Sequence, residues 1–264
     1  MMNWTEVTGL FLKNKKIKNY QLCRGENNMK TFQNIILIAR PAAGKSEIID
    51  YLKRTPLDER IKRFHIGELV ILDDFPLLWA WFEEDAILTK MDLPRLHTNK
   101  DGYFKHQYFW DVLLQRLNID YDKINRDSLS KNNITCLIEF SRGKEHGGYA
   151  RAFENISTKI LTDAVILYIK VSWEESLRKN RNRFNPQRPD SILEHSLPDK
   201  KLKKLYHKCD FLELTDDDFG IINIKDQKVP YAIFENEDDL TSLADHRLGE
   251  RLENILGKLW EINS

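Results

Sequence analysis

The sequence has few cysteines and no net charge. Only three of its 264 residues are cysteine, and Cys23, Cys136 and Cys209 lie far apart without the spacing of a metal site. This pattern indicates reduced thiols in a cytoplasmic protein and argues against a disulfide-stapled secreted domain. Lysine plus arginine and aspartate plus glutamate each total 41, so no overall basic field favours a nucleic acid or a membrane as partner. Any anion site must therefore be local.

Long hydrophobic runs are also absent. The longest apolar stretches cover about residues 34–39, 134–140 and 164–171, each far shorter than the roughly 20 residues of a membrane span. The first 28 residues contain several lysines but no continuous hydrophobic segment, which disfavours a secretory signal. We expect a soluble protein in which residues 1–28 form a loosely ordered extension or an upstream start, and residues 29–264 form one domain.

The chain does contain a regular alternation of short β-rich runs and longer helical patterns. The expected strands are 34–39, 68–73, 134–140, 164–171 and 230–235, and the expected helices are 45–54, 104–118, 148–158, 173–183 and 241–262. This alternation predicts an α/β fold with a parallel sheet covered on both faces. The stretches 76–103 and 184–229 interrupt it, and we interpret them as insertions at the sheet rim, where ligand contacts are added in such folds.

The segment ARPAAGKS, residues 39–46, lies between the first expected strand and the first expected helix. It matches the phosphate-binding (Walker A) pattern G-x-x-x-x-G-K-[ST] except at its first position, where alanine replaces glycine; alanine is tolerable there if its φ is negative. Gly44 gives a tight backbone, Lys45 a cation and Ser46 a hydroxyl for Mg²⁺. A chance GKS tripeptide is the ordinary alternative. The predicted nucleotide-binding residues are Arg40, Pro41, Ala42, Ala43, Gly44, Lys45 and Ser46.

Acidic residues end the second and third expected strands. The run ILDDFP places Asp73 and Asp74 there, and LIEFSRG places Glu139 and Arg142 at the same edge. We expect one of the two aspartates, with Asp73 preferred, to orient an acceptor hydroxyl, and Glu139 to serve Mg²⁺ together with Ser46, directly or through water. The ordinary alternatives are a capped turn at the aspartates and an ion pair at Glu139.

Three arginines follow the fourth expected strand. The run VSWEESLRKNRNR carries Arg178, Arg181 and Arg183 on a helix that leads into the second insertion, and Arg188 extends the basic run. A single arginine of this kind is more often a solvated helix residue. Their clustering favours a contact between at least one of them and a phosphate, with a catalytic role.

Other residues have weaker functional signals. Trp79, Trp81 and Phe82 could stack on a ring, although a core role is the more common one for aromatic side chains. His146, followed by two glycines, is interpreted as part of a surface loop, with substrate contact as the alternative. The basic segment 199–208 is expected to be a solvated helix face.

Together these features resemble the P-loop small-molecule kinases, that is, nucleoside, nucleotide and related kinases of the adenylate kinase-like fold. The resemblance covers about residues 31–260 as an order of elements, and only the phosphate loop is a specific motif. DDFP is similar to the DDF or DSF turn of uridine kinase and nicotinamide riboside kinase relatives, whose first acid acts on the acceptor hydroxyl; this implies that role for Asp73. The resemblance further implies a three-layer fold with a five-stranded parallel sheet of order 2-3-1-4-5, and an arginine-bearing lid.

The expected function is therefore ATP- and Mg²⁺-dependent phosphoryl transfer to a small hydroxylated or phosphorylated metabolite of nucleoside or nucleotide type. No NKxD-like guanine motif is present, which argues against a GTPase, and the choice between ATP, the expected donor, and GTP stays open. Two alternatives stay open: a nucleotide-binding regulatory NTPase without a small-molecule acceptor, and a kinase acting on a nucleic acid or its building blocks. Ala39, the long second insertion and the motif-free 76–103 region depart from the kinase pattern and leave the acceptor open.

Overall fold

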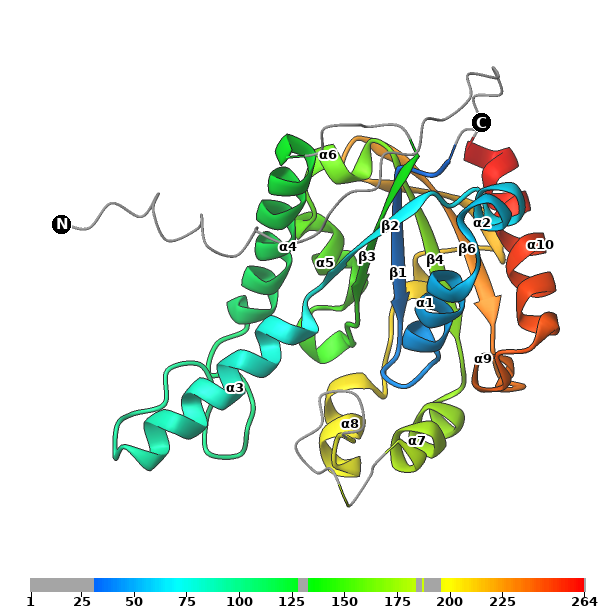
Figure 1. Ribbon diagram of the computed structural model, residues 1–264. Helices are drawn as coiled ribbons and strands as arrows, with labels where there is room; N and C mark the ends of the chain where they lie inside the picture. The colour runs from blue at the N-terminus through cyan, green and yellow to red at the C-terminus, as the bar shows by residue number, and fades with distance from the viewer. Residues whose placement is uncertain (1–30, 128–132, 184–186, 188–195, 264) are drawn as a thin grey trace, which may run out of the picture.

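A mostly parallel six-stranded sheet forms the centre of the molecule. The computed structural model describes residues 31–127, 133–183, 187 and 196–263, and its strands follow the order β2-β3-β1-β4-β6-β5 (Figure 1). Five strands run parallel, and β5 pairs antiparallel with β6. The strands are β1 (Asn34–Ala39), β2 (Glu68–Asp73), β3 (Ile134–Phe140), β4 (Ala164–Lys170), β5 (Phe219–Ile224) and β6 (Gln227–Glu235).

Helices cover both faces of this sheet. Those on one face include α1, α2 and α10, and those on the other include α4, α5 and α6, which gives three layers. None of the helices in the described ranges combines the length and apolar character that a bilayer crossing demands. The helices are α1 (Lys45–Arg54), α2 (Leu57–Phe64), α3 (Phe75–Lys90), α4 (Tyr108–Asp127), α5 (Gly148–Asn155), α6 (Thr158–Leu161), α7 (Trp173–Asn182), α8 (Asp199–Tyr206), α9 (Leu240–Leu243) and α10 (His246–Asn263).

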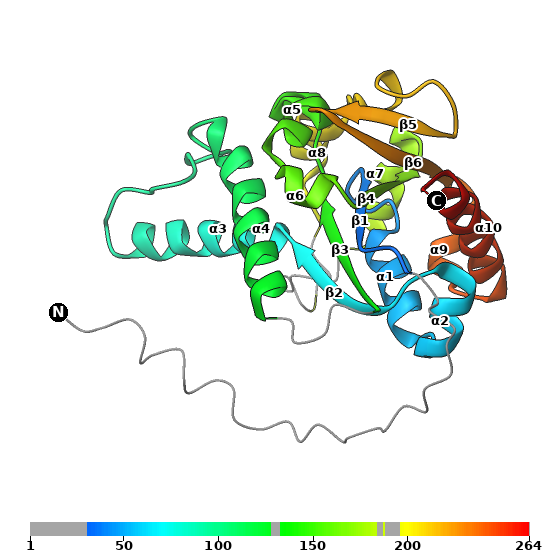
Figure 2. The same ribbon diagram turned by 90° about the horizontal axis from the view of Figure 1, so that it is seen from above.

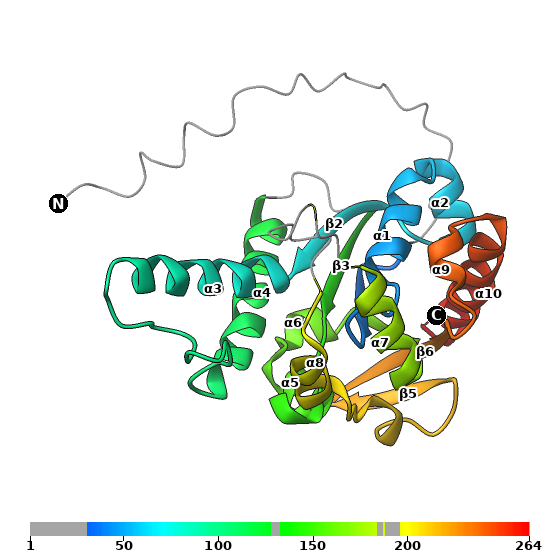
Figure 3. The same ribbon diagram turned by 90° about the horizontal axis from the view of Figure 1, so that it is seen from below.

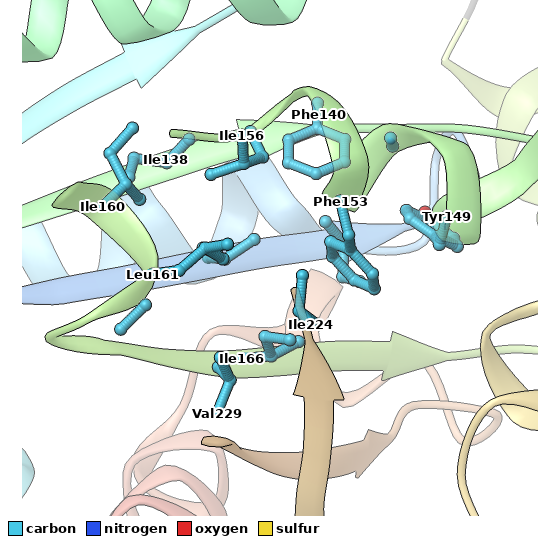
Figure 4. Packing of buried hydrophobic residues seen from close by; sticks show 14 of the residues in the cluster. Ile138, Phe140, Tyr149, Phe153, Ile156, Ile160, Leu161, Ile166, Ile224 and Val229 are labelled. Carbon is cyan, nitrogen blue, oxygen red and sulfur yellow. The ribbon is translucent and has the colours of Figure 1, made fainter. Parts of the chain in front are cut away.

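The sheet has a hydrophobic core on each face, because successive side chains of a strand point to opposite faces. Ile36 and Ile38 of β1 point into the core on the α4, α5 and α6 side, whereas Ile35 and Leu37 point into the core beneath α1 and α10. Figure 4 shows the first cluster, in which side chains of β3, β4, α5, α6 and the β5–β6 hairpin meet. Buried apolar strands of this kind need helices on both faces, and the sequence supplies them.

The α/β fold class expected from the sequence is confirmed, and the sheet is consistent with a P-loop-like three-layer fold. The sheet has six strands where five were expected, because the stretch 184–229 also contributes α8 and the antiparallel edge strand β5. The stretch 76–103 consists largely of α3, which extends outward from the sheet (Figure 2). The expected N-terminal extension, residues 1–28, lies outside the described residues.

Candidate active site

The turn between β1 and α1 is held from behind by hydrogen bonds to alternate carbonyl groups. The three donors come from α5, α7 and the loop after β6, and each bond is 2.9 Å long: Tyr149 Oη to the Ala39 carbonyl, Ser176 Oγ to that of Pro41, and Asn236 Nδ2 to that of Ala43. These bonds fix the carbonyl side of the loop. The opposite side, where the first-turn N–H groups of α1 lack intrahelical partners, is available to an anion.

Two residues of this turn have left-handed backbone conformations. Gly44 has φ 114°, and a Cβ atom there would lie 2.5 Å from Thr241 Oγ1 and 2.9 Å from Asn236 Nδ2, so only glycine fits. Ala42 has φ 57°, a conformation that is strained for alanine. Ala39, by contrast, is the last residue of the extended strand β1. Its position therefore does not require glycine, as the sequence analysis expected.

Lys45 and Ser46 begin α1 and border a single cavity of about 270 Å³. Lys45 Nζ donates a hydrogen bond to Ser141 Oγ, just after β3, at 2.7 Å. The guanidinium of Arg183 donates to Ser46 Oγ at 3.3 Å, which brings a second cation to the helix N-terminus. Figure 3 shows the molecule from the side on which α7 and α8 lie near the turn that precedes α1.

Two carboxylates face this cavity from adjacent strands. The register of β2 and β3 pairs Asp73 with Glu139 at the carboxyl end of the sheet. Glu139 is buried, and its Oε2 has no hydrogen-bond partner among the described residues. Burial raises the pKa of Glu139, although the charge of Lys45 opposes this shift. An unpartnered carboxylate oxygen beside a lysine and a serine hydroxyl is suited to a hydrated cation.

Burial and the neighbouring Glu139 raise the pKa of Asp73 to about 7. One backbone bond opposes the shift: the N–H of Phe75 donates to Asp73 Oδ1 at 2.9 Å. No ion-pair partner for Asp73 exists within the described part of the chain. The pKa of Asp73 therefore lies where a carboxylate can exchange a proton near neutral pH.

Asp74 has a different role from its neighbour. Its Oδ2 lies 2.7 Å from Arg142 Nη1, and both side chains are buried. Arg142 also donates to the Trp110 carbonyl at 3.1 Å and stands over the Trp110 ring. Asp74 Oδ2 thus lies beside a cation, although the contact lacks hydrogen-bond geometry, whereas Asp73 has no ion-pair partner among the described residues.

A second, larger cavity of about 390 Å³ adjoins the first. Its walls come from α3, α4, α8 and the segments around them, and many of them are aromatic. The two cavities share five wall residues: Phe75, Leu78, Trp110, Leu197 and Tyr206. A molecule that fills the larger cavity can therefore extend toward Asp73 and Lys45.

The expected lid arginines separate in space. Arg178 pairs with Glu175 and Asp239, each at 2.6 Å, and Arg181 pairs with Asp199 at 2.6 Å. Neither lines either cavity, whereas Arg183 lines the smaller one beside Lys45 and Ser46. Arg188 lies outside the described residues.

Arg40, expected among the nucleotide-binding residues, turns its side chain away from the cavity. Its guanidinium donates to the carbonyls of Val171, Tyr206 and His207 at 2.9, 3.3 and 3.3 Å. Arg40 thereby ties the loop to the end of β4 and to α8. Only the backbone of Arg40 is left to contact a nucleotide.

His146 does not lie in an exposed surface loop, as the sequence analysis preferred. It is 2% exposed and lies between Trp110 and Tyr206, because the glycines that follow it let the chain fold back at α5. Trp79 and Phe82 line the larger cavity. The expected packing role fits Trp81 best, which contacts His97, Phe104 and Phe109.

Several residues of the site were not singled out from the sequence. Ser141, beside Glu139 in the run LIEFSRG, could have been found as a hydroxyl at the same strand end. Tyr149, Ser176, Asn236 and Thr241 carry no sequence signal, because only the fold brings them behind the turn between β1 and α1.

Among the described residues, no group of three or more histidine, cysteine or acidic side chains gathers to form a metal cage. Mg²⁺ does not require such a cage, since it commonly binds through one or two carboxylates, waters and phosphate oxygens. The chain matches no protein-family model, and a search of curated proteins finds no significant similarity.

Proposed function

We propose that this protein is a kinase that transfers the γ-phosphoryl group of ATP to a hydroxyl group of a small metabolite. One observation carries the proposal: a strand-to-helix turn held by its carbonyls, with Lys45 and Ser46, faces Asp73 and Glu139 across a cavity of about 270 Å³. Phosphoryl transfer depends on positioning and charge stabilisation, and these are the groups that supply both.

The loop and the first turn of α1 would hold the phosphates. Their N–H groups favour anions, and Lys45 adds a positive charge that already reaches across the cavity to Ser141. Arg183, beside Ser46, is the arginine placed to neutralise charge on the transferred group. Arg178 and Arg181 belong to ion pairs outside the cavity, so Arg183 is the arginine that we propose for this role.

Ser46 and Glu139 are the residues that would hold Mg²⁺. The fit rests on Glu139, which lines the same cavity as Ser46 and whose buried Oε2 lacks a hydrogen-bond partner among the described residues. When bound, the ion supplies positive charge to the phosphate oxygens. The carboxylate of Glu139 would balance part of that charge, and a bound cation would offset the burial that raises the pKa of Glu139.

Asp73 would accept the proton of the acceptor hydroxyl. A general base works best when its pKa lies near the working pH, and burial with Glu139 raises the pKa of Asp73 to about 7. The Phe75 N–H fixes Oδ1, so the carboxylate has a defined orientation at the end of β2. The acceptor itself enters from the adjoining aromatic cavity.

Labelled ATP, Mg²⁺ and a pooled metabolite library test this proposal. We expect the label to appear on a small product, and Lys45→Ala to lose this transfer. Lys53→Ala is the matched control, because Lys53 lies exposed on the last turn of the same helix. Free phosphate alone would indicate a regulatory NTPase instead, and transfer to an added oligonucleotide would indicate a nucleic-acid kinase. The absence of any turnover with ATP or GTP would contradict the proposal.

A further inference from the structure

Helix α3 is apolar on every side and yet is not buried. Most of its 16 residues, FPLLWAWFEEDAILTK, are apolar, and they are spread around the helix rather than gathered on one face. The structure describes α3 in full, and Asp85 is its only buried residue. The helix extends outward from the sheet (Figure 2). A helix that is apolar all round is normally covered, so the exposed surface of α3 calls for a partner.

One side of α3 is occupied within the chain. Leu78, Trp79 and Phe82 line the larger cavity, and Asp85 accepts hydrogen bonds from the N–H groups of residues 96–98. These contacts fix α3 against the rest of the arm, which we define as α3 and residues 91–107. The opposite side is the one left for a partner.

The opposite side, here called the outer face, follows the helical repeat at spacings of three and four residues. It consists of Ala80, Glu83, Glu84, Ile87, Lys90 and the residue after the helix, Met91. Ala80 is half-buried and the other five are exposed, Ile87 by 54% and Met91 by 60%. The outer face therefore has an apolar centre with charged residues beside it.

The apolar part of the outer face continues at the tip of the arm through Leu93, which is 47% exposed. Ile87, Met91 and Leu93 together expose on the order of 300 Å², the size at which an apolar patch on a monomer often has a function. Two such patches, with the charged residues beside them, would bury about 1,000 Å², which reaches the lower limit of a specific protein–protein interface. A second copy of the chain thus offers enough surface.

The charges of the outer face fit a second copy in one direction. The face is acidic at Glu83 and Glu84 and basic at Lys90. Two antiparallel helices that cross at Ile87 bring Lys90 of each copy level with Glu83 and Glu84 of the other, which joins opposite charges twice. A parallel pair, or a crossing centred on the two glutamates, would place like charges together. The outer face is therefore complementary to itself.

We propose that the outer face of α3 is the contact surface of a homodimer, in which the α3 helices of two copies cross antiparallel around Ile87. One patch then serves both copies, as in other twofold dimers. The side of α3 that lines the larger cavity points away from this contact, so the dimer leaves the cavity open. The dimer requires no nucleotide and stands whether or not the kinase proposal does.

Sedimentation velocity of the full-length protein tests this contact. We expect a reversible monomer–dimer equilibrium with a Kd on the order of 10 µM, as suits a small interface. Ile87→Asp places two carboxylates at the centre of the contact and should weaken association at least about 30-fold. Leu57→Asp is the matched control, because Leu57 on α2 is 45% exposed and lies outside the arm; its Kd should stay within about twofold. A wild type that remains monomeric at about 100 µM, or an Ile87→Asp variant that associates like the wild type, would overturn the proposal.

Charge reversal tests the antiparallel direction. Lys90→Glu makes the charged residues of the outer face all acidic, and the double variant Glu83→Lys/Glu84→Lys makes them all basic. Each variant alone should associate about tenfold more weakly than the wild type, whereas an equimolar mixture should form a heterodimer at least as tight as the wild-type dimer. Damage to the fold of the arm would not be repaired by mixing. A mixture that stays monomeric, while the wild type dimerises, would show that the dimer uses a different surface.

Discussion

Two regions of the molecule each bury an acidic side chain, but they surround it in opposite ways. In the arm formed by α3 and the segment after it, Asp85 is 0% exposed and accepts hydrogen bonds from the N–H groups of Leu96, His97 and Thr98 and from Thr98 Oγ1. Burial alone would raise the pKa of Asp85. These bonds outweigh it and hold the pKa well below its usual range.

In the cavity at the end of the sheet, Asp73 accepts one backbone hydrogen bond and faces Glu139. Its pKa is raised by burial and by that neighbour. The contrast separates two uses of a carboxylate withdrawn from water, since Asp85 is buried and Asp73 is half-buried. Asp85 has a full set of donors and stabilises the arm, whereas Asp73 has a single backbone donor and Glu139 Oε2 has none among the described residues, which is the arrangement expected where a cation binds or a proton moves.

The largest expected effect concerns Asp73. Asp73→Asn keeps an oxygen that accepts the Phe75 N–H but removes the charge, so we expect turnover to fall by about 10²–10⁴-fold while the free energy of unfolding does not decrease. Steady-state kinetics with the acceptor found in the library assay, and urea denaturation, measure the two quantities. Full turnover in a folded variant would show that Asp73 is not the base.

The matching substitution in the arm, Asp85→Asn, should lower the stability of the arm and leave ATP binding unchanged. The new amide NH₂ group faces the N–H groups that donated hydrogen bonds to the carboxylate. The free energy of local unfolding of the arm should therefore fall by about 3 kcal/mol. Hydrogen exchange at the amides of Leu96, His97 and Thr98 reports this loss. ATP affinity should stay within about twofold of the wild type. Unchanged protection of these amides would contradict the structural role of Asp85.

The free energy of unfolding should depend on pH in different ways through Asp73 and through Asp85. Because the folded pKa of Asp73 is raised, its cost to stability is absent below about pH 4, grows as the pH rises, and is complete above about pH 7. The stability advantage of Asp73→Asn should therefore shrink between pH 8 and pH 5. Urea denaturation at these two pH values measures it, and an advantage that stays constant would contradict the raised pKa.

Asp85 should behave differently over this range. Its folded pKa is lowered, so its contribution is fully present above its unfolded pKa of about 3.9 and is lost only as the pH falls further. The difference in amide protection between the wild type and Asp85→Asn should thus be the same at pH 8 and pH 5. A difference that disappears by pH 5 would contradict this assignment.

The smallest expected effect lies in the backbone of the turn between β1 and α1. Ala42→Gly relieves a left-handed alanine, which costs about 1–2 kcal/mol, but increases the entropy of the unfolded chain by about 0.4–1 kcal/mol. The net gain in the free energy of unfolding should be about 0.5 kcal/mol, measured by urea denaturation. A destabilised variant would show that Ala42, with its φ of 57°, is not strained in solution.

The features that sequence predicted well are those encoded over a few neighbouring residues. The run NIILIARPAAGKS carries an apolar strand, a turn and a helix start in one segment, so this strand-turn-helix unit and its place in the fold were predictable. Strand ends are equally local, and in a parallel sheet they meet at one edge. This is why Asp73 and Glu139 could be expected to approach each other before their register was known.

The features that sequence missed depend on contacts between distant segments. Asp85 finds its donors eleven to thirteen residues later, and His146 is buried against Trp110 and Tyr206 from two other helices. No local sequence pattern specifies these contacts between distant segments. Arg178 lies between these two cases. Glu175 precedes it by three residues on the same helix face, and this spacing predicts an ion pair that competes with a phosphate contact.

Equilibrium binding of ATP with Mg²⁺, measured by isothermal titration calorimetry on the wild type, Lys45→Ala and the control Lys53→Ala, tests most directly whether the turn before α1 holds phosphate. Loss of one charge-assisted contact should weaken ATP binding by about 10–100-fold in Lys45→Ala and leave Lys53→Ala within about twofold of the wild type. Equal affinities for the wild type and Lys45→Ala, or no ATP binding by the wild type, would contradict the account.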